Sequence, residues 1–202
     1  MLPTVLPMLA TASSPFDASP YSSEVKWDGV CMLAAVEASG WRLWGRAAAD
    51  YTTRYPELAV LRRLPPATLV DGECVAFDAA GVPDLALLLR RHGLTNPWKI
   101  AQAWRYCSVR YVLFDLLYYR GRCLIHKPLS LRRTVLAEAC SRLDTAAVVF
   151  SAGVVGAGTA FFAAAVAQGH EGIVAKLLTS RYRPGRRSAA WLKIKPRQQK
   201  RG

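Results

Sequence analysis

Runs of apolar residues of strand length recur along most of the chain. Many are rich in the β-branched and aromatic residues that pack well on sheets. Ser39 and Gly40 separate the first two runs, as expected for a hairpin turn. The predicted strands cover residues 30–37, 41–46, 68–78, 109–119, 148–150, 172–178 and 190–195.

Other segments carry apolar residues at helical spacing. We predict helices over residues 55–64, 85–91 and 128–143, and a fourth between Thr159 and Gly169. Asp84 is placed to cap the second helix, Thr159 to cap the fourth and Gly169 to end it. Helices and strands are interspersed and the early strands are hairpin-linked, so the expected class is α+β with largely antiparallel sheets.

The composition fits one folded domain. The chain has 202 residues, of which 52% are hydrophobic and 20% charged, enough to bury a core. The uncharged stretch 146–166 lacks Leu and Ile and contains three glycines, so we expect no membrane span. No basic residue precedes Lys26, which argues against a secretory signal. Five widely spaced cysteines predict a reducing, cytoplasmic environment.

Positive charge is concentrated at the C-terminal end. The chain has 27 Lys and Arg against 14 Asp and Glu, a net charge of +13. From Glu171 onward there are ten Lys or Arg and one acid, a net charge of 10 − 1 = +9. Such a block favours a polyanionic partner, either nucleic acid or nucleotide phosphate, with an anionic membrane surface as the weaker alternative.

Several short motifs carry candidate chemistry, each with an ordinary structural alternative. Lys26, between Glu24 and Asp28, is a candidate nucleophile or a solvated lysine. Lys193 and Lys195 share one face of a predicted strand and can reach one phosphate, or can simply face solvent. The other motifs are Asp71-Gly72-Glu73, Phe114-Asp115 and the segment from Glu171 to Lys176.

Taken together and in this order, the motifs KWDG, DGE, FDLL, EGIVAK and WLKIK resemble those of ATP-dependent DNA ligases. These enzymes share a superfamily with RNA ligases and mRNA capping enzymes, and the compact bacterial end-joining ligases are the most similar. The resemblance covers nearly the whole chain. It implies the ATP-grasp-like nucleotidyltransferase fold over residues 1–195, followed by a basic tail at 196–202 with no OB-fold domain.

The resemblance also implies a role for each motif. Lys26 would attack the α-phosphate of ATP, and neighbouring cations and partial desolvation would favour its neutral form. Lys193 and Lys195 would stabilise charge on that phosphate. The remaining implied contacts are Glu24 near the adenine, Phe114 stacked on it, Asp28 and Arg46 at the nucleotide, Lys176 at a phosphate, and Glu73 and Glu171 at the ribose or at Mg²⁺ or Mn²⁺.

The expected activity is that of an ATP-dependent DNA ligase in DNA repair or recombination, passing AMP to the 5′-phosphate of nicked duplex DNA. Three departures from the family pattern stand out. Cys31 occupies the position of a family arginine, Gly45-Arg46-Ala47-Ala48 lacks the usual serine and glycine, and the expected OB-fold domain does not follow WLKIK. The missing arginine and OB-fold favour an alternative, a catalytically impaired protein that binds nucleotide or DNA. An OB-fold domain or an end-joining partner supplied in trans would complete the expected machinery.

Overall fold

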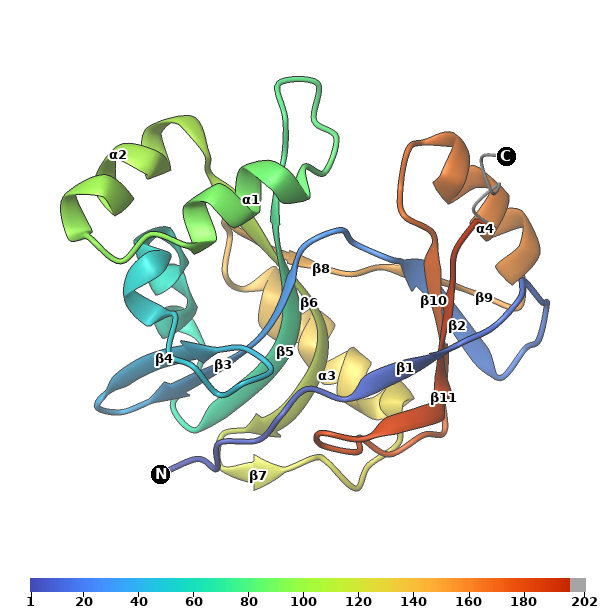
Figure 1. Cartoon of the computed structure of the whole chain (residues 1–202). Helices are drawn as coiled ribbons and strands as arrows, with labels where there is room; N and C mark the ends of the chain where they lie inside the picture. The colour runs from blue at the N-terminus through green and yellow to red at the C-terminus, as the bar shows by residue number, and fades with distance from the viewer. Residues whose placement is uncertain (197–202) are drawn as a thin grey trace.

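The computed structural model describes residues 1–196 as two β-sheets with helices on their outer faces (Figure 1). The smaller sheet has the strand order β1-β11-β10-β2-β9, and the larger has β4-β3-β5-β6-β7, with β8 paired to β6. Among the described residues, neighbouring strands are antiparallel except for β1 with β11 and β6 with β8. The predicted α+β class is confirmed.

The smaller sheet combines strands from the two ends of the described chain. Its strands are β1 (Leu9–Ala12), β2 (Tyr21–Val25), β9 (Gly153–Val155), β10 (Ile173–Leu177) and β11 (Arg187–Ile194). Helix α4 (Gly158–Ala167) covers one face, where Ala165 packs with Ile173 and Ile194. Residues far apart in sequence therefore meet on this sheet.

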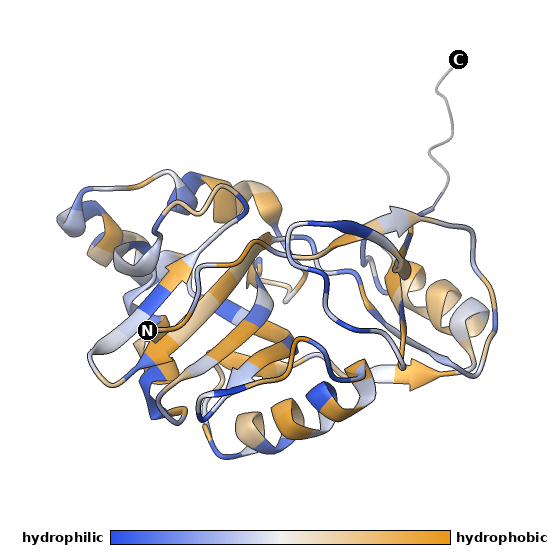
Figure 2. Cartoon of the chain, turned by 90° about the horizontal axis from the view of Figure 1, so that it is seen from below, coloured by the Kyte–Doolittle hydropathy of each residue, from blue (hydrophilic) through white to orange (hydrophobic). Residues whose placement is uncertain are grey.

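The larger sheet is buried on both faces. Its strands are β3 (Val30–Glu37), β4 (Gly40–Trp44), β5 (Thr68–Ala76), β6 (Val109–Tyr119), β7 (Arg122–Cys123) and β8 (Val148–Phe150). On β3, Met32 and Ala34 belong to the core on the helical side, whereas Leu33 and Ala35 pack with Trp191 on the other side. Strands covered on both faces read as continuous apolar runs, and Figure 2 shows strands that are largely hydrophobic along their length.

Helices cover the outer face of the larger sheet. They are η1 (Thr52–Arg54), η2 (Pro56–Arg63), α1 (Leu85–His92), α2 (Pro97–Tyr106) and α3 (Leu129–Ser141). Asp84 caps α1 as predicted, because its carboxylate accepts the Leu87 N–H at 2.8 Å. The helix expected over 55–64 is the 3₁₀-helix η2, whose three residues per turn place Leu58 and Leu61 on one buried face.

The assignment of Thr159 as a cap is wrong. Helix α4 begins at Gly158, and the Thr159 N–H donates instead to the carboxylate of Asp17 at 2.8 Å. The cap therefore comes from a residue remote in sequence, which a local pattern does not reveal. The prediction for Gly169 is confirmed, because it follows the helix with a φ of +82°.

Some elements were not predicted. Strands β1, β2, β7 and β9 are short, and β2 is polar at Ser22, Ser23 and Glu24. Helix α2 does have a local signal, since Asn96 accepts the N–H groups of Trp98 and Lys99 and Pro97 follows it. The hairpin of β3 and β4 is confirmed, although its turn is Ala38-Ser39 rather than Ser39-Gly40.

The stretch 146–166 forms β8, β9 and part of α4. Within residues 1–196, no helix combines the length and apolar character needed to cross a membrane. The five cysteines, all of which lie in the described part, are free. Apart from Pro196, the expected basic tail lies outside the described residues.

Candidate nucleotide site

A cavity of about 130 Å³ lies between the two sheets and collects most of the predicted site residues. The site residues predicted from the sequence that line this cavity are Glu24, Lys26, Arg46, Glu73, Phe114, Lys176 and Lys193. Pockets that bury a whole small ligand commonly measure about 300–1,000 Å³. This cavity therefore suits a group the size of one base, and a larger ligand requires side chains at the mouth to move.

Lys26 is fixed at the cavity by two contacts with the segment before β10. Its backbone N–H donates to the carbonyl oxygen of Gly172 at 2.9 Å, and its Nζ donates to Glu171 Oε2. The second oxygen of Glu171 accepts a hydrogen bond from Lys195 Nζ. The carboxylate of Glu171 thus bridges two of the predicted phosphate-binding lysines.

The bridge keeps Glu171 ionised. Burial alone would raise the pKa of Glu171, but the hydrogen bonds from Lys195 and Lys26 outweigh burial and hold the pKa below its usual value. An ionised carboxylate binds a cation rather than accepting a proton. Glu171 is therefore suited to exchange its lysine partners for a metal ion.

Two glycines allow this close approach. A Cβ atom at Gly29 would lie 2.2 Å from the carbonyl oxygen of Cys74 and 2.9 Å from Cγ of Glu73, both on β5. A Cβ atom at Gly172 would lie 2.1 Å from the carbonyl oxygen of Ile194. The glycines of the KWDG and EGIVAK motifs therefore let the segments that carry Lys26 and Glu171 lie directly on neighbouring strands.

Glu73 lines the same cavity, but its pKa is shifted upward, whereas the pKa of Glu171 is shifted downward. Burial raises its pKa to about 8, Lys26 opposes the rise, and the charges of Asp71 and Glu171 add to it. Among the described residues no hydrogen bond or ion pair joins the Glu73 side chain to another group. Glu73 therefore remains available to an incoming cation.

The two carboxylates fit a magnesium ion that is held partly by substrate. No group of three or more His, Cys, Asp or Glu residues within 1–196 is arranged to hold a metal on its own. Mg²⁺ commonly takes one or two carboxylates and completes its octahedron with phosphate oxygens and water. Glu73 and Glu171 can supply that carboxylate pair.

The inner end of the cavity is aromatic and cationic. Nζ of Lys176 lies 4.0 Å from the ring centroid of Phe114 and 4.5 Å from that of Trp191. The same nitrogen donates to Glu24 Oε2 at 3.1 Å, and burial lowers its pKa although Glu24 opposes this. Lys176 is thus engaged inside the cavity, away from the bridge at Glu171, and its contact with a phosphate stays a prediction.

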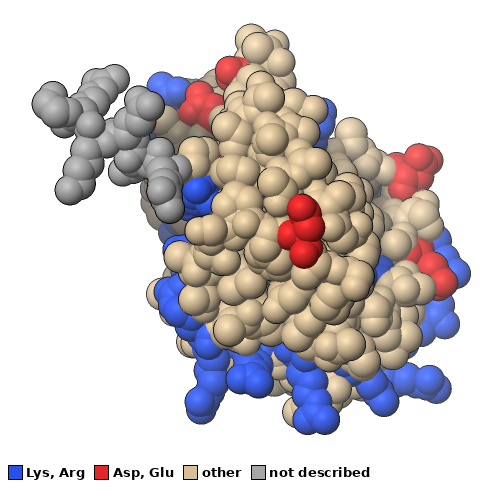
Figure 3. Space-filling model, turned by 90° about the vertical axis from the view of Figure 1, so that its right-hand side faces the viewer, with Lys and Arg blue, Asp and Glu red and all other residues tan. Residues whose placement is uncertain are grey.

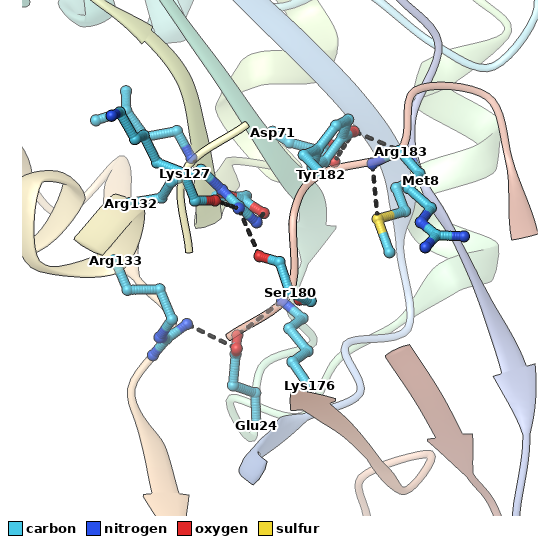
Figure 4. A network of polar contacts seen from close by, with 12 residues as sticks. Met8, Glu24, Asp71, Lys127, Arg132, Arg133, Lys176, Ser180, Tyr182 and Arg183 are labelled. Carbon is cyan, nitrogen blue, oxygen red and sulfur yellow. Dashed lines mark hydrogen bonds and ion pairs between the residues drawn. The ribbon is translucent and has the colours of Figure 1, made fainter. Parts of the chain in front are cut away.

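Glu24 is held from two sides. In addition to Lys176, Arg133 of α3 forms an ion pair with it, with Nη1 lying 2.6 Å from Oε1 (Figure 4). Arg133 is in turn anchored by donating to the carbonyl oxygen of Ser151 at 2.7 Å. Glu24 is 1% exposed, so its carboxylate is fixed by buried cations before any ligand arrives.

A second buried network ties the two sheets together beside the cavity. The Tyr182 hydroxyl donates to Asp71 Oδ2 at 2.6 Å (Figure 4). Arg132 donates to both carboxylate oxygens of Asp115. Arg132 also donates to the carbonyl oxygen of Ser180, close to Tyr182 in the β10–β11 connection. Burial raises the pKa of Asp71 to about 7, against the hydrogen bond from Tyr182.

Sequence reasoning and structure differ at a few positions. Three predicted site residues are not among those that line the cavity: Asp28, which is half-buried, and Glu171 and Lys195, which reach the site through the bridge to Lys26. Trp191 and Arg133 were missed as site residues. Trp191 opens the WLKIK motif and could have been singled out there. Arg133 ends the segment PLSLRR, but its contact with Glu24, made from a remote helix, has no signal in the sequence.

Comparisons with known proteins agree with this geometry. A family described as "ATP dependent DNA ligase domain" matches residues 1–195. A probable DNA ligase from Anaeromyxobacter is 35% identical over 96% of this chain and 38% of the relative. The multifunctional non-homologous end joining DNA repair protein LigD of Mycobacterium tuberculosis is 33% identical over 94% of this chain and 24% of the relative. The chain thus spans well under half the length of these relatives.

Two solved structures of ligase domains have the same fold as this chain. The crystal structure of the ligase domain of M. tuberculosis LigD superposes with a TM-score of 0.78 at 32% identity, covering 95% of this chain and 60% of that one. A mycobacterial DNA ligase D complexed with ATP and MES gives a TM-score of 0.74 at 32% identity with the same coverage. The expected nucleotidyltransferase fold is thereby confirmed.

Proposed function

Since the chain belongs to the ATP-dependent DNA ligase domain family, we propose that it attaches AMP to Lys26 and passes it to the 5′-phosphate of nicked DNA. The observation that carries the proposal is the position of Lys26, at the cavity lined by Phe114 and hydrogen-bonded to Glu171. The same proposal includes the nucleotide and metal contacts predicted for the other site residues. It also includes the sealing of nicks in DNA repair or recombination.

The arrangement supports an in-line displacement at phosphorus. A base in the cavity, stacked on Phe114, would direct its phosphates toward Lys26. The Lys26 amine, after losing a proton, would form a bond to the α-phosphorus as the bond to the pyrophosphate oxygen breaks. Lys193 and Lys195 would offset the growing negative charge, and catalysis would rest largely on positioning and electrostatics.

The lysine–carboxylate bridge suggests how the site responds to substrate. Glu171 and Glu73 would hold the cation. Lys26 and Lys195, which Glu171 bridges, lie where they would contact the phosphates. Bound Mg²⁺ would supply charge neutralisation at the phosphates, consistent with the general chemistry of phosphoryl transfer.

An arginine-rich surface supports contact with the DNA backbone. Arg181, Arg183 and Arg186, in the β10–β11 connection, and Arg187, which begins β11, are all exposed. Figure 3 shows Lys and Arg side chains along the lower edge of the molecule, the end where this connection and β7 lie in Figure 1. DNA bound there through its phosphates would lose affinity steeply with salt.

Labelling with α-³²P-ATP and Mg²⁺ tests the proposal. We expect a covalent protein adenylate that survives denaturation and is absent from Lys26→Ala. Lys127→Ala, which alters an exposed lysine outside the cavity, is the matched control and should label like the unchanged chain. An unlabelled chain, or label that persists in Lys26→Ala, would overturn the assignment.

The second candidate function is nucleotide or DNA binding without nick sealing, and the observation that favours it is Cys31 on the cavity wall. A thiol lacks the forked charged donors of arginine. Sealing of nicked duplex DNA, measured with and without an OB-fold domain of a related ligase added in trans, separates the two candidates. A cytoplasmic location stays a prediction from the cysteine spacing.

A further inference from the structure

The outward face of α2 presents two large aromatic side chains to solvent. Trp98 is 69% exposed and Tyr106 is 70% exposed, which, Met1 aside, makes them the most exposed large hydrophobic side chains among residues 1–196. The opposite side of the helix is fixed by Ile100 and Ala103, which are buried. The exposure of the two rings is therefore set by a helix whose inner face is firmly packed.

Helical geometry places cations between these rings. Trp98, Gln102 and Arg105 follow the i, i+4, i+7 spacing of one helix column, and Lys99 and Tyr106 are seven residues apart in the next. Lys99 and Arg105 are both exposed. One face of α2 thus carries two cationic groups between two aromatic groups over about 12 Å, at 1.5 Å per residue.

The surrounding segment is free of negative charge. From Leu85 to Phe114 the sequence contains five Lys or Arg and no Asp or Glu. Of these five, Arg91 is buried and paired with Glu57, while the others are exposed. They are Arg90, Lys99, Arg105 and Arg110. These four exposed cations are separate in sequence from the C-terminal block, and none of them lines the cavity.

The position of α2 also separates it from the nucleotide site. Figure 1 shows α2 on the side of the larger sheet turned away from the smaller sheet, which carries Glu24, Lys176 and Lys193. None of the α2 residues lines the cavity. A ligand on this face would therefore leave the contacts of Lys26 unchanged.

We propose that the outward face of α2 binds single-stranded DNA. Exposed aromatic rings stack on unpaired bases of any sequence, and interspersed cations contact the phosphates. Trp98 and Tyr106 are eight residues apart, about 12 Å along the helix axis, so each ring takes a separate base. Duplex DNA is a poorer partner because its bases are stacked on one another and offer no free faces to these rings. An acidic protein surface would pair with the cations but would have no bases to stack on the two rings.

Fluorescence anisotropy with a labelled oligothymidylate tests this inference in the unmodified full chain. We expect Trp98→Ala and Tyr106→Ala each to weaken binding about tenfold and the double variant about a hundredfold, because each ring takes a separate base. Trp98→Phe should retain most of the affinity. Leu131→Ala, an exposed apolar residue on α3, is the matched control and should bind normally.

Salt dependence and labelling complete the test. Arg105→Gln should reduce the slope of log affinity against log salt by about 0.7, the value for one lost phosphate contact on a single strand. The double aromatic variant should still form the Lys26 adenylate, which keeps this inference distinct from the proposed function. Unchanged oligonucleotide affinity in the double variant would overturn it. A loss of self-association on sedimentation, without loss of DNA binding, would overturn it in favour of a protein interface.

Discussion

Nζ of Lys26 donates a hydrogen bond to Oε2 of Glu171, a residue 145 positions later in the chain. The neighbouring Gly172 accepts the backbone N–H of Lys26, so nucleophile and carboxylate are joined through both side chain and main chain. The proposed nucleophile thus rests against an anion that competes with a phosphate for its hydrogen bonds. Metal and nucleotide binding are expected to be coupled through this one carboxylate.

Glu171→Gln should make adenylate formation strongly dependent on Mg²⁺ concentration. The amide keeps the shape of the side chain but removes the charge that attracts a cation. We expect the Mg²⁺ concentration for half-maximal labelling to rise at least tenfold, with partial recovery at high Mg²⁺. Glu138→Gln on α3, remote from the cavity, is the matched control. An unchanged Mg²⁺ requirement would remove Glu171 from the metal site.

Cys31→Arg should strengthen nucleotide binding. Cys31 lines the cavity, its Sγ lies 3.7 Å from Oδ1 of Asp71, and burial followed by the charges of Asp71 and Glu73 raises its pKa. A guanidinium there would pair with these acids and offer donors to a phosphate or ribose. The KM for ATP in single-turnover labelling should fall several-fold. If Cys31→Met gives the same decrease, side-chain length rather than charge is responsible.

Arg132→Met should destabilise the fold by about 3–5 kcal/mol, since it leaves the buried carboxylate of Asp115 without a charged partner. Both side chains are fully buried, and Arg132 Nε lies 2.7 Å from Asp115 Oδ1. Urea unfolding followed by circular dichroism measures the change. Arg142→Met, at the exposed end of α3, should change the free energy of unfolding by no more than about 0.5 kcal/mol. Equal effects of the two substitutions would contradict a structural role for the buried pair.

The contribution of His92 to stability should decrease as the pH falls below the usual pKa of histidine, whereas the raised pKa values of Glu73 and Asp71 act in the opposite direction. Burial, and secondarily Arg54, lowers the pKa of His92, whose Nδ1 lies 2.8 Å from the Tyr55 hydroxyl. The unfolded chain therefore takes up this proton at a higher pH than the folded chain, so protonation favours unfolding. Relative to the unchanged chain, His92→Gln should shift the melting temperature upward at about pH 5 more than at about pH 7. His126→Gln, at an exposed position, should give the same pH dependence as the unchanged chain.

The sequence predicted what local patterns encode. Continuous apolar runs located β3, β5 and β6, and Asp84 marked the start of α1, because burial and capping depend on adjacent residues. The motifs located Lys26, Glu73 and Phe114. What the sequence could not show are contacts between distant segments: Asp17 at the start of α4, Arg133 against Glu24, and the engagement of Lys176 inside the cavity. The polar strand β2 was missed because its neighbours in the sheet, rather than its own pattern, hold it in place.

The composition of the smaller sheet has a consequence for synthesis on the ribosome. β1 and β2 emerge first, yet their partners β11 and β10 lie more than 140 residues later, as their pairing shows. The larger sheet takes its strands from the intervening chain and can assemble earlier. Glu171 and Lys195, which complete the site around Lys26, therefore join it only after almost all of the described chain has left the exit tunnel. Lys26 can react only once β10 and β11 have paired with β2 and β1.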